Sequence, residues 1–512
     1  MSSTGREVRK PPRDARGILR MLGPGLILAG GIVGSGELIA ATHTGAKAGF
    51  IFLGLIIFGC VVKCFTQVEM ARHSIAQGET TLSLLNRVPG PRVAIGRIKV
   101  NWIVLMWGIT MLVGLGQLGG IVGGVGQAMA TTVPITEHGR AYNRAADLNA
   151  TALVVQQQLK RETDAAKRAE LQAKMAEHKA AIGGFDFSRK PYDDRLWAVI
   201  LAGITMIVLT RGGFGFIEGF AAVLVALFTL VTVINLFALQ SQPDWSISGA
   251  EVQSGLGFGF LSSGSAKLGL ALSTFGIIGV GASEIVGYPY WCLEKGYGRW
   301  TGPRREGDTW RERARGWLRV MQWDAWLSMV VYTFCTIVFY LLGAAVLSRL
   351  GLVPEKQDLI RTLSVMYAPV FGGHAQWIFL LGAVAVLYST FFISNATKCR
   401  LFADVADVAG VVKLDDTRRA CWVRRLGYVL PGLCVLVYLV WPNPGKLVIY
   451  SGLFQSLLLP ALGFAVLWLR YREKDSALLS GRVWDVMLWL SFLSFVGIGL
   501  YLAITKLGKI FG

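Results

Sequence analysis

Long apolar segments recur through most of this 512-residue chain, and they constrain its fold more than any other feature. A helix needs about 20 predominantly apolar residues to cross a bilayer core of about 30 Å. Backbone groups in hydrocarbon must pair within their own segment, so we expect these segments to be helices. About eleven spans are predicted, at roughly residues 21–45, 49–76, 100–131, 193–211, 213–240, 266–294, 319–348, 368–397, 424–441, 446–470 and 484–506.

The composition agrees with a membrane protein, because 53% of the residues are hydrophobic and only 16% are charged. A soluble chain of this length would need more charge to cover its surface. The net charge of +19 could suggest a nucleic-acid partner, but the basic residues lie at the ends of the apolar spans, as the positive-inside rule requires. We therefore expect the lipid bilayer as a partner, and no nucleic acid.

Basic loops also predict the orientation of the chain. Residues 1–20 are polar and basic and lack a signal-peptide cleavage site, so we expect a cytoplasmic N-terminal segment. The loops after spans 2, 6, 8 and 10 are basic as well, and all of them fall on the same side as the N-terminus. The sequence thus predicts a multi-pass protein of the cell (inner) membrane, with transmembrane helices 1–3 at 21–131 and helices 4–11 at 193–506.

Residues 135–191 form a polar insertion after the third span. Much of this insertion is rich in Ala, Gln, Lys, Arg and Glu, which favours a solvent-exposed helix or helical hairpin. The predicted topology places it on the extracytoplasmic side. A solvated helix explains its balanced charge, and a partner-binding module is the alternative.

Two similar tetrads lie in the middle of predicted spans 1 and 6, namely Gly34–Glu37 (Gly-Ser-Gly-Glu) and Gly281–Glu284 (Gly-Ala-Ser-Glu). The two spans run in opposite directions in the predicted topology, and interrupted helices at corresponding positions of inverted repeats mark a transporter binding site. Clustered glycines favour local unwinding, which frees carbonyls that can coordinate a cation. The alternative is that the small residues allow close helix packing and that each Glu is protonated or paired with a buried base such as Lys63.

Several further motifs resemble the Nramp family of metal transporters over most of the chain outside 135–191. They are Gly23-Pro24-Gly25 before the first tetrad, Thr44–Phe50 as the family's AGAxAGY, the spaced Gln67, Ala71, Arg72 and Gly78, Ile217-Glu218, and Ser456 with Pro460. The resemblance implies an all-α membrane protein of the LeuT-type fold, with two inverted five-helix repeats and an eleventh helix. It also implies a secondary transporter that moves a divalent metal cation by alternating access.

The resemblance breaks down at the metal site itself. The family's metal-binding Asp falls on Gly34 and its Asn on Glu37, while its Met-Pro-His falls on 282–284. The soft thioether ligand is lost, so an oxygen-only site would suit harder ions such as Mg²⁺ or Mn²⁺. The implied metal site comprises Glu37, Glu284, Gly34, Ser35, Ala282 and Ser283, and no cofactor is expected besides the transported cation.

Coupling and pathway residues are less defined by the sequence. The family's acidic pair on span 3 falls near Gln117 and Gly120, which do not titrate, so proton symport and uncoupled passage both remain open. The candidate pathway or coupling residues are Gln117, Tyr288, Asp324, Asn395 and Lys63. The glycine-rich span 3, from Gly114 to Gly126, is interpreted as a packing surface.

Two other functions are kept as alternatives. A LeuT-fold transporter of an amino acid or amine would use the same half-helices for an organic solute. A non-transporting membrane sensor or scaffold would use the insertion as its binding module. Neither a Walker-A motif nor a nucleophile–base constellation is found in the sequence, so ATP-driven pumping and enzymatic catalysis are not expected.

Overall fold

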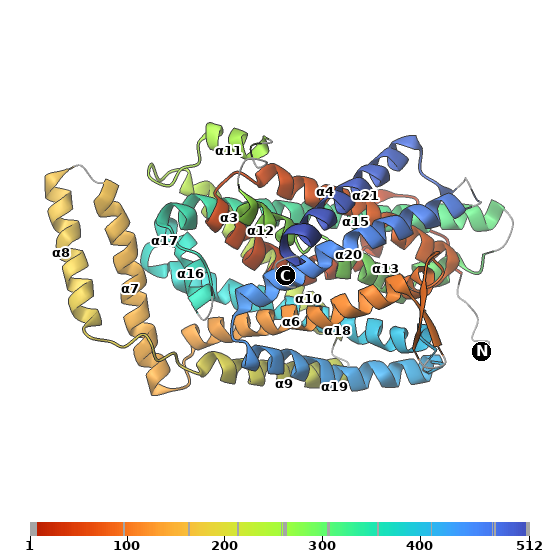
Figure 1. The fold of residues 1–512 in the computed structure, drawn as a ribbon, viewed down its shortest axis with the longest axis horizontal. Coiled ribbons are helices and arrows are strands. Elements are labelled where there is room, and N and C mark those ends of the chain that lie inside the picture. Colours follow the sequence, from red (N-terminus) through yellow and green to blue (C-terminus); the bar gives the residue numbers. More distant parts are fainter. Residues whose placement is uncertain are drawn as a thin grey trace.

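A bundle of long helices makes up the computed structural model, with a helical hairpin across one end (Figure 1). The structure describes residues 8–507 except for 96–97, 162–163, 212–213, 258, 260–263, 305–307, 356–357, 411, 474 and 476–477. Within these residues the helices are α1 Ala15–Met21, α2 Pro24–Ile32, η1 Val33–Ala41, α3 Thr42–Ala48, α4 Leu53–Gln77, α5 Thr81–Leu85, α6 Trp102–Thr132, α7 Glu137–Arg161, α8 Ala165–Ile182, α9 Asp193–Arg211, α10 Phe214–Leu239, α11 Gly249–Leu256, α12 Ser265–Phe275, α13 Ala282–Lys295, α14 Tyr297–Thr301, α15 Asp308–Leu342, η3 Gly343–Ser348, α16 Leu359–Ser364, η5 Val365–Tyr367, α17 Ala368–Phe371, η6 Gly372–His374, α18 Ala375–Val408, α19 Asp416–Val440, α20 Pro444–Arg472, α21 Arg482–Leu502 and η8 Ala503–Leu507.

Eight of the helical stretches are long and apolar enough to cross a membrane, counted over the described residues alone. The prediction of membrane-crossing helices is therefore confirmed. Predicted spans 4, 5 and 6 correspond to α9, α10 and the pair α12 and α13, which fall outside that group of eight. The count of eleven spans stays a prediction.

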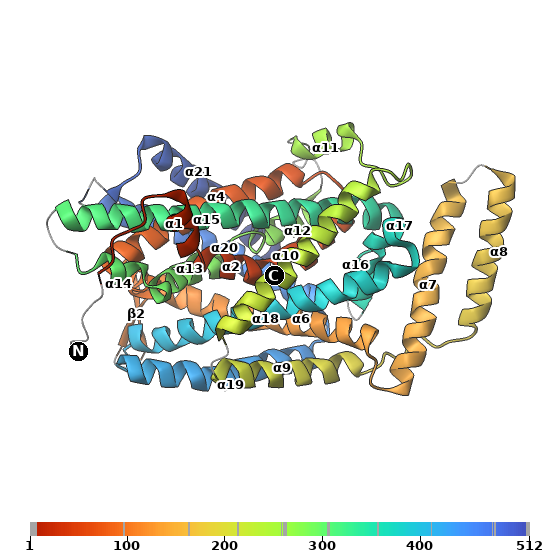
Figure 2. The ribbon, with the colours of Figure 1, turned by 180° about the vertical axis from the view of Figure 1, so that it is seen from behind.

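Helix α6, predicted span 3, is central to the packing. It contacts α9, α18, α19 and α20, and α9 and α19 lie side by side along one edge of the bundle in both views (Figures 1 and 2). Asn101 caps the N-terminus of α6 by accepting the N–H of Ile103 at 3.0 Å. A side chain at Gly119 would meet the carbonyl oxygen of Cys434 at 2.7 Å, so glycine brings the α6 and α19 backbones together. The predicted packing role of this glycine-rich helix is confirmed there.

Predicted span 1 is not unwound, which corrects the expectation of a broken helix at Gly34–Glu37. The chain runs from α2 through the π-helical segment η1 into α3 without a non-helical gap. Ser35 lies within this segment, and serine keeps the backbone N–H that a helix-breaking proline would lack. The extra residue in each π turn is a local adjustment of a continuous helix rather than a break, and such bulges are frequent at functional sites.

A two-stranded sheet and a helical hairpin lie at opposite ends of the bundle. Strands β1 Arg92–Ile95 and β2 Ile98–Asn101 pair antiparallel at the end where the N-terminus lies, and the sequence did not indicate them (Figure 2). Residues 135–191 contain the hairpin of α7 and α8 at the other end (Figure 1). Ion pairs join residues 135–191 to the segment before α18, where Arg361 contacts Asp147 of α7 and Lys190, after α8, lies 2.6 Å from Asp358.

Candidate cation site in the interrupted sixth span

Predicted span 6 is divided into α12 and α13 by a non-helical connection at 276–281. The sequence predicted the interruption at Gly281–Glu284, but 282–284 form the first turn of α13, so the break lies mainly before the tetrad. Gly279 adopts a φ of +54°, a left-handed conformation that glycine accepts without strain. A side chain on Gly276 would overlap the α20 backbone at Gly452. Glycines are thus required both by the turn and by the close approach of α20. The break leaves backbone carbonyls without the helical partners they would otherwise have.

Two fully buried ionisable side chains bind this break from different helices. Glu37, in η1, accepts the backbone N–H of Gly279 on Oε1 at 2.8 Å, while its Oε2 is buried without a hydrogen-bond partner among the described residues. Lys63, in α4, donates to the carbonyl oxygens of Phe275 and Ile278, both at 2.5 Å. The ammonium group therefore binds the freed carbonyls of span 6. The ion pair with a glutamate that the sequence suggested is not found among the described residues.

Oxygen atoms converge on the other side of the connection, beside Gly281. A Cβ placed on Gly281 would lie 2.5 Å from Glu284 Oε2, 2.7 Å from Gln455 Oε1 and 3.0 Å from the carbonyl oxygen of Gly276. The hydroxyl of Ser283 is buried nearby and has no hydrogen-bond partner in the described part of the chain. A carboxylate, an amide, a carbonyl and a free hydroxyl form a donor set that suits a hard cation.

A hydrogen-bonded network connects this point to spans 1, 3 and 10. Gln117 donates from Nε2 to Ser35 Oγ at 3.0 Å, and its Oε1 accepts from Gln455 Nε2 at 2.8 Å and from Ser451 Oγ at 3.1 Å. Gln455 Oε1 also accepts the backbone N–H of Ser283 at 3.2 Å. The predicted residues Ser35, Gln117 and Ser283 are thus brought together by one network.

Gln455 and Ser451 are the main residues that sequence reasoning missed. Both interrupt the apolar run of predicted span 10, and they lie four residues apart on one face of α20. Polar residues inside a membrane span usually face the bundle interior, so this spacing was an available signal. Lys398 was missed as well; it lines a cavity of about 20 Å³ together with Ser283 and Glu284. That volume is close to the space one water molecule needs.

The remaining predicted residues have other partners. Asp324 accepts the backbone N–H groups of Gly23 at 2.8 Å and Gly25 at 2.5 Å, and the Tyr288 hydroxyl at 2.9 Å. Asp324 and Tyr288 therefore hold the N-terminus of span 1. Asn395 donates to a carbonyl of its own helix, at Phe391.

The other residues of the first tetrad contribute mainly backbone. Gly34 donates its N–H to Thr390 Oγ1 at 3.0 Å, and a side chain at Gly36 would lie 2.6 Å from the carbonyl oxygen of Ile277. Ala282 is fully buried at the first position of α13. Glu218, part of a family motif, has a side chain outside the described residues.

His, Cys, Asp and Glu do not gather in groups of three or more that could hold a metal, as far as the chain is described. A cation here would depend on the amide, hydroxyl and carbonyl oxygens at Gly281, which agrees with the oxygen-only donor set inferred from sequence.

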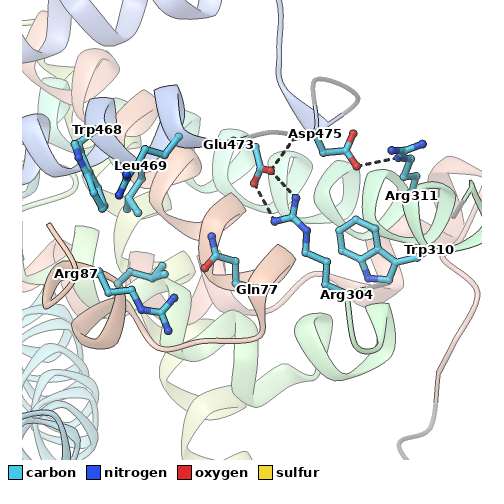
Figure 3. Close-up of a pocket in the computed structure, with 11 residues that line it drawn as sticks. Gln77, Arg87, Arg304, Trp310, Arg311, Trp468, Leu469, Glu473 and Asp475 are labelled. Carbon is cyan, nitrogen blue, oxygen red and sulfur yellow. Dashed lines mark hydrogen bonds and ion pairs between the residues drawn. The ribbon is translucent and has the colours of Figure 1, made fainter. Parts of the chain in front are cut away.

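Two larger cavities lie away from this site. One of about 410 Å³ is bordered by Lys47, Lys267, Lys446 and Glu355. The other, of about 630 Å³, is shown in Figure 3 and contains two ion pairs, Arg304 with Glu473 and Arg311 with Asp475. Trp310 and Trp468 also line it.

These features define a membrane transporter with the LeuT-type fold. Crystal structures of a manganese transporter from Eremococcus coleocola share the fold, with a TM-score of 0.57 and 16% identity over 99% of this chain and 90% of that one. A mutant form of the same transporter gives a TM-score of 0.59 at 15% identity, with the same coverage. Among curated proteins, none matches the sequence significantly.

A family model described as natural resistance-associated macrophage protein-like (Nramp) matches residues 171–505, and the chain belongs to this family. Nramp proteins are divalent metal-ion transporters and not enzymes, so the resemblance inferred from sequence is confirmed. Glu284 and Gln455 lie within the matched residues, whereas Glu37 and Lys63 precede them.

Proposed function

We propose that this protein moves a hard divalent cation, such as Mg²⁺ or Mn²⁺, across the cell membrane by alternating access. The observation that carries the proposal is the convergence of Glu284, Gln455 and the Gly276 carbonyl beside Gly281, with the unpartnered Ser283 hydroxyl nearby. All of these ligands are oxygens, and Mg²⁺ and Mn²⁺ prefer oxygen ligands. The structurally similar Eremococcus coleocola protein is described as a manganese transporter, which agrees with this choice.

Glu37 supplies the second carboxylate in this proposal, since its Oε2 is buried and without a partner among the described residues. Two carboxylates would balance the charge of a divalent ion. Ser35 and the backbone at Gly34 and Ala282 complete the site from the two central segments. We place the N-terminus in the cytoplasm and the hairpin of α7 and α8 outside.

The first test is divalent-ion binding to purified protein and uptake into proteoliposomes. Glu284→Gln and Gln455→Leu should each reduce affinity for Mg²⁺ or Mn²⁺ by at least tenfold, because a direct ligand oxygen is weakened or lost. Glu294→Gln is the matched control: it lies on the same helix but is surface-exposed and paired with Arg400. The proposed site would be contradicted if uptake were equal in Glu284→Gln, Glu294→Gln and wild type. Recording the pH inside the proteoliposomes during uptake decides whether protons accompany the ion.

A second candidate is an organic solute that carries a carboxylate, such as an amino acid. It is favoured by the basic lining of the 410 Å³ cavity, where Lys47, Lys267 and Lys446 face a single acid, Glu355. Lysines attract anions and repel free cations in such a cavity. Inhibition of the transport signal by amino acids, with no effect of divalent ions, would select this candidate.

A further inference from the structure

The ammonium group of Lys63 occupies a position that a free cation would suit. Lys63 is fully buried in α4, 2.5 Å from each of two backbone carbonyl oxygens and 4.8 Å from the centre of the Phe275 ring. A buried ammonium group is costly unless it is paired and hydrogen-bonded. Here two carbonyl dipoles and an aromatic face meet that requirement.

The two carbonyls are available because the helix breaks at this point. In a continuous α-helix, the Phe275 carbonyl would accept the N–H of Gly279, four residues later. Instead, that N–H donates to Glu37 Oε1 at 2.8 Å, and the carbonyl accepts from Lys63. The break therefore interrupts one backbone hydrogen bond: Lys63 binds its acceptor, and Glu37 binds its donor.

Freed carbonyls next to a carboxylate at a helix break are the chemistry that coordinates monovalent cations in transporters with discontinuous helices. Lys63 brings the same single positive charge to these carbonyls, but it is covalently attached and cannot exchange with solvent. Glu37 binds the same break through the N–H of Gly279.

We propose that Lys63 is a tethered cation that fills a built-in monovalent site at the break of span 6, so that the wild-type protein needs no free monovalent ion there. Phe275 and Ile278 provide the carbonyls of this site, and Glu37 binds the N–H of Gly279 at the same break. The inference stands on the geometry of the break and is independent of which cargo the protein carries.

The chain provides a matched control in Lys398. This second lysine is also buried, but it lies beside Met111 Sδ, at 3.6 Å, and lines the small cavity that contains Glu284. Replacement of either lysine by methionine removes one buried charge and keeps a similar length. Only replacement of Lys63 should open a cation site at the carbonyls.

The test is thermal unfolding of the purified full-length protein in sodium, potassium or N-methyl-D-glucamine chloride at constant ionic strength. The midpoint of the wild type should be the same in all three salts. Lys63→Met should unfold several degrees lower in N-methyl-D-glucamine, and sodium or potassium should raise its midpoint in a saturable manner. Lys398→Met should show no difference among the salts.

Lys63→Gln serves as a second variant, since its amide retains two N–H donors but carries no charge. Equal midpoints in all three salts for both Lys63 variants would overturn the proposal. Failure of both variants to fold even in sodium and potassium would also overturn it, because a free ion should then replace the ammonium group.

Divalent-ion uptake provides a separate readout. If wild type takes up no divalent ion while Lys63→Met still shows the monovalent-ion response, the proposed cargo is wrong and the tethered cation stands. If uptake is normal but the response is missing, the tethered cation is wrong and the proposed cargo stands.

Discussion

At the scale of single residues, the candidate site depends on Gly281, because a glycine has no side chain to fill the space between the oxygen ligands. Gly281 leaves open the volume on which oxygens of Glu284, Gln455 and Gly276 converge. Its backbone is extended, with a φ of −78°, so alanine can adopt the same conformation. A methyl group there would overlap the side-chain oxygens of Glu284 and Gln455, at 2.5 and 2.7 Å, and would compete with a bound ion.

We predict that Gly281→Ala reduces divalent-ion affinity at least tenfold while the protein remains folded, because the new methyl group fills the volume. Titration of Mn²⁺ against purified protein measures the effect. Gly203→Ala is a suitable control, since its added Cβ meets no atom within 4 Å. Unchanged Mn²⁺ affinity in Gly281→Ala would place the ion elsewhere.

Glu355 lies outside the membrane spans, and its carboxyl group should make the stability of the folded protein modestly dependent on pH. A hydrogen bond from Lys47, at 2.7 Å, holds the pKa of the Glu355 carboxyl below its ordinary value of 4.5. A lowered pKa means that the carboxylate contributes stability above pH 4.5, and that this contribution is lost as the pH falls through the lowered value. Both side chains are more than a third exposed, so the contribution is about 0–1 kcal/mol.

Glu355→Gln should therefore unfold at a slightly lower temperature than wild type at neutral pH, and the difference should vanish below about pH 4. Thermal unfolding in detergent across this range measures it. A difference that widens on acidification would show that the Lys47 contact does not stabilise the folded state in this way.

At the scale of elements, the glycine-rich face of α6 sets how closely neighbouring helices approach. We predict that Gly119→Ala destabilises the protein by about 1–3 kcal/mol, because its Cβ would lie 2.7 Å from the Cys434 carbonyl oxygen of α19. Gly108→Ala, on the same helix, meets no atom within 4 Å and should leave stability equal or slightly higher. If the two variants unfolded at the same midpoint, this packing role would be refuted.

The hairpin of α7 and α8 gives a second prediction at this scale. Helix α8 has no buried residue, whereas α7 is joined to the bundle through Asp147, which contacts Arg361 and accepts from Gln376 at 2.9 Å. Replacement of α8 by a short flexible linker should therefore preserve folding and uptake, as measured in proteoliposomes. Loss of uptake in a folded, linker-containing protein would instead assign the hairpin a direct role in transport.

The sequence predicted an interruption of span 6, although at Gly281–Glu284 rather than at 276–281, and it did not predict the continuous helix of span 1. Both tetrads contain glycine, yet the turn that breaks span 6 depends on a glycine outside the tetrad, Gly279, which adopts a left-handed conformation. In span 1 the glycines serve close contact with neighbouring segments, as Gly36 does against Ile277. Glycine content alone cannot separate these two uses, because the difference depends on what packs against each residue.

The candidate site was predictable in part for a similar reason. Glu284 and Ser283 stood out because they form a repeated motif, whereas Gln455 has no counterpart in a repeat and is recognised only once α20 is placed against the break. Lys63 was noted as a partner for a buried acid, but its carbonyl contacts depend on the path of residues 275–278. Tertiary contacts between distant segments decide such roles.

At the scale of the whole molecule, the proposed orientation can be tested with the native cysteines. Of the seven, Cys421 alone is exposed, and it lies between pairs of arginines at the end of α19 that we place in the cytoplasm. A membrane-impermeant maleimide should therefore label inverted vesicles and not intact cells.

The reverse experiment uses Ala169→Cys in α8, combined with Cys421→Ser. This variant should react in intact cells, because the hairpin lies at the opposite end of the bundle from the N-terminus (Figure 1). Labelling of Cys421 from outside and of residue 169 only from inside would invert the proposed topology.

The protruding hairpin has a practical consequence for imaging. Detergent or nanodisc density hides most of a 55.7 kDa membrane protein, which leaves few landmarks for aligning single particles. Helix α8 extends well past the bundle and is exposed along its length (Figure 2). An antibody fragment raised against it would add a rigid marker at one pole, so that successive conformations of the transport cycle could be sorted without touching the ion pathway.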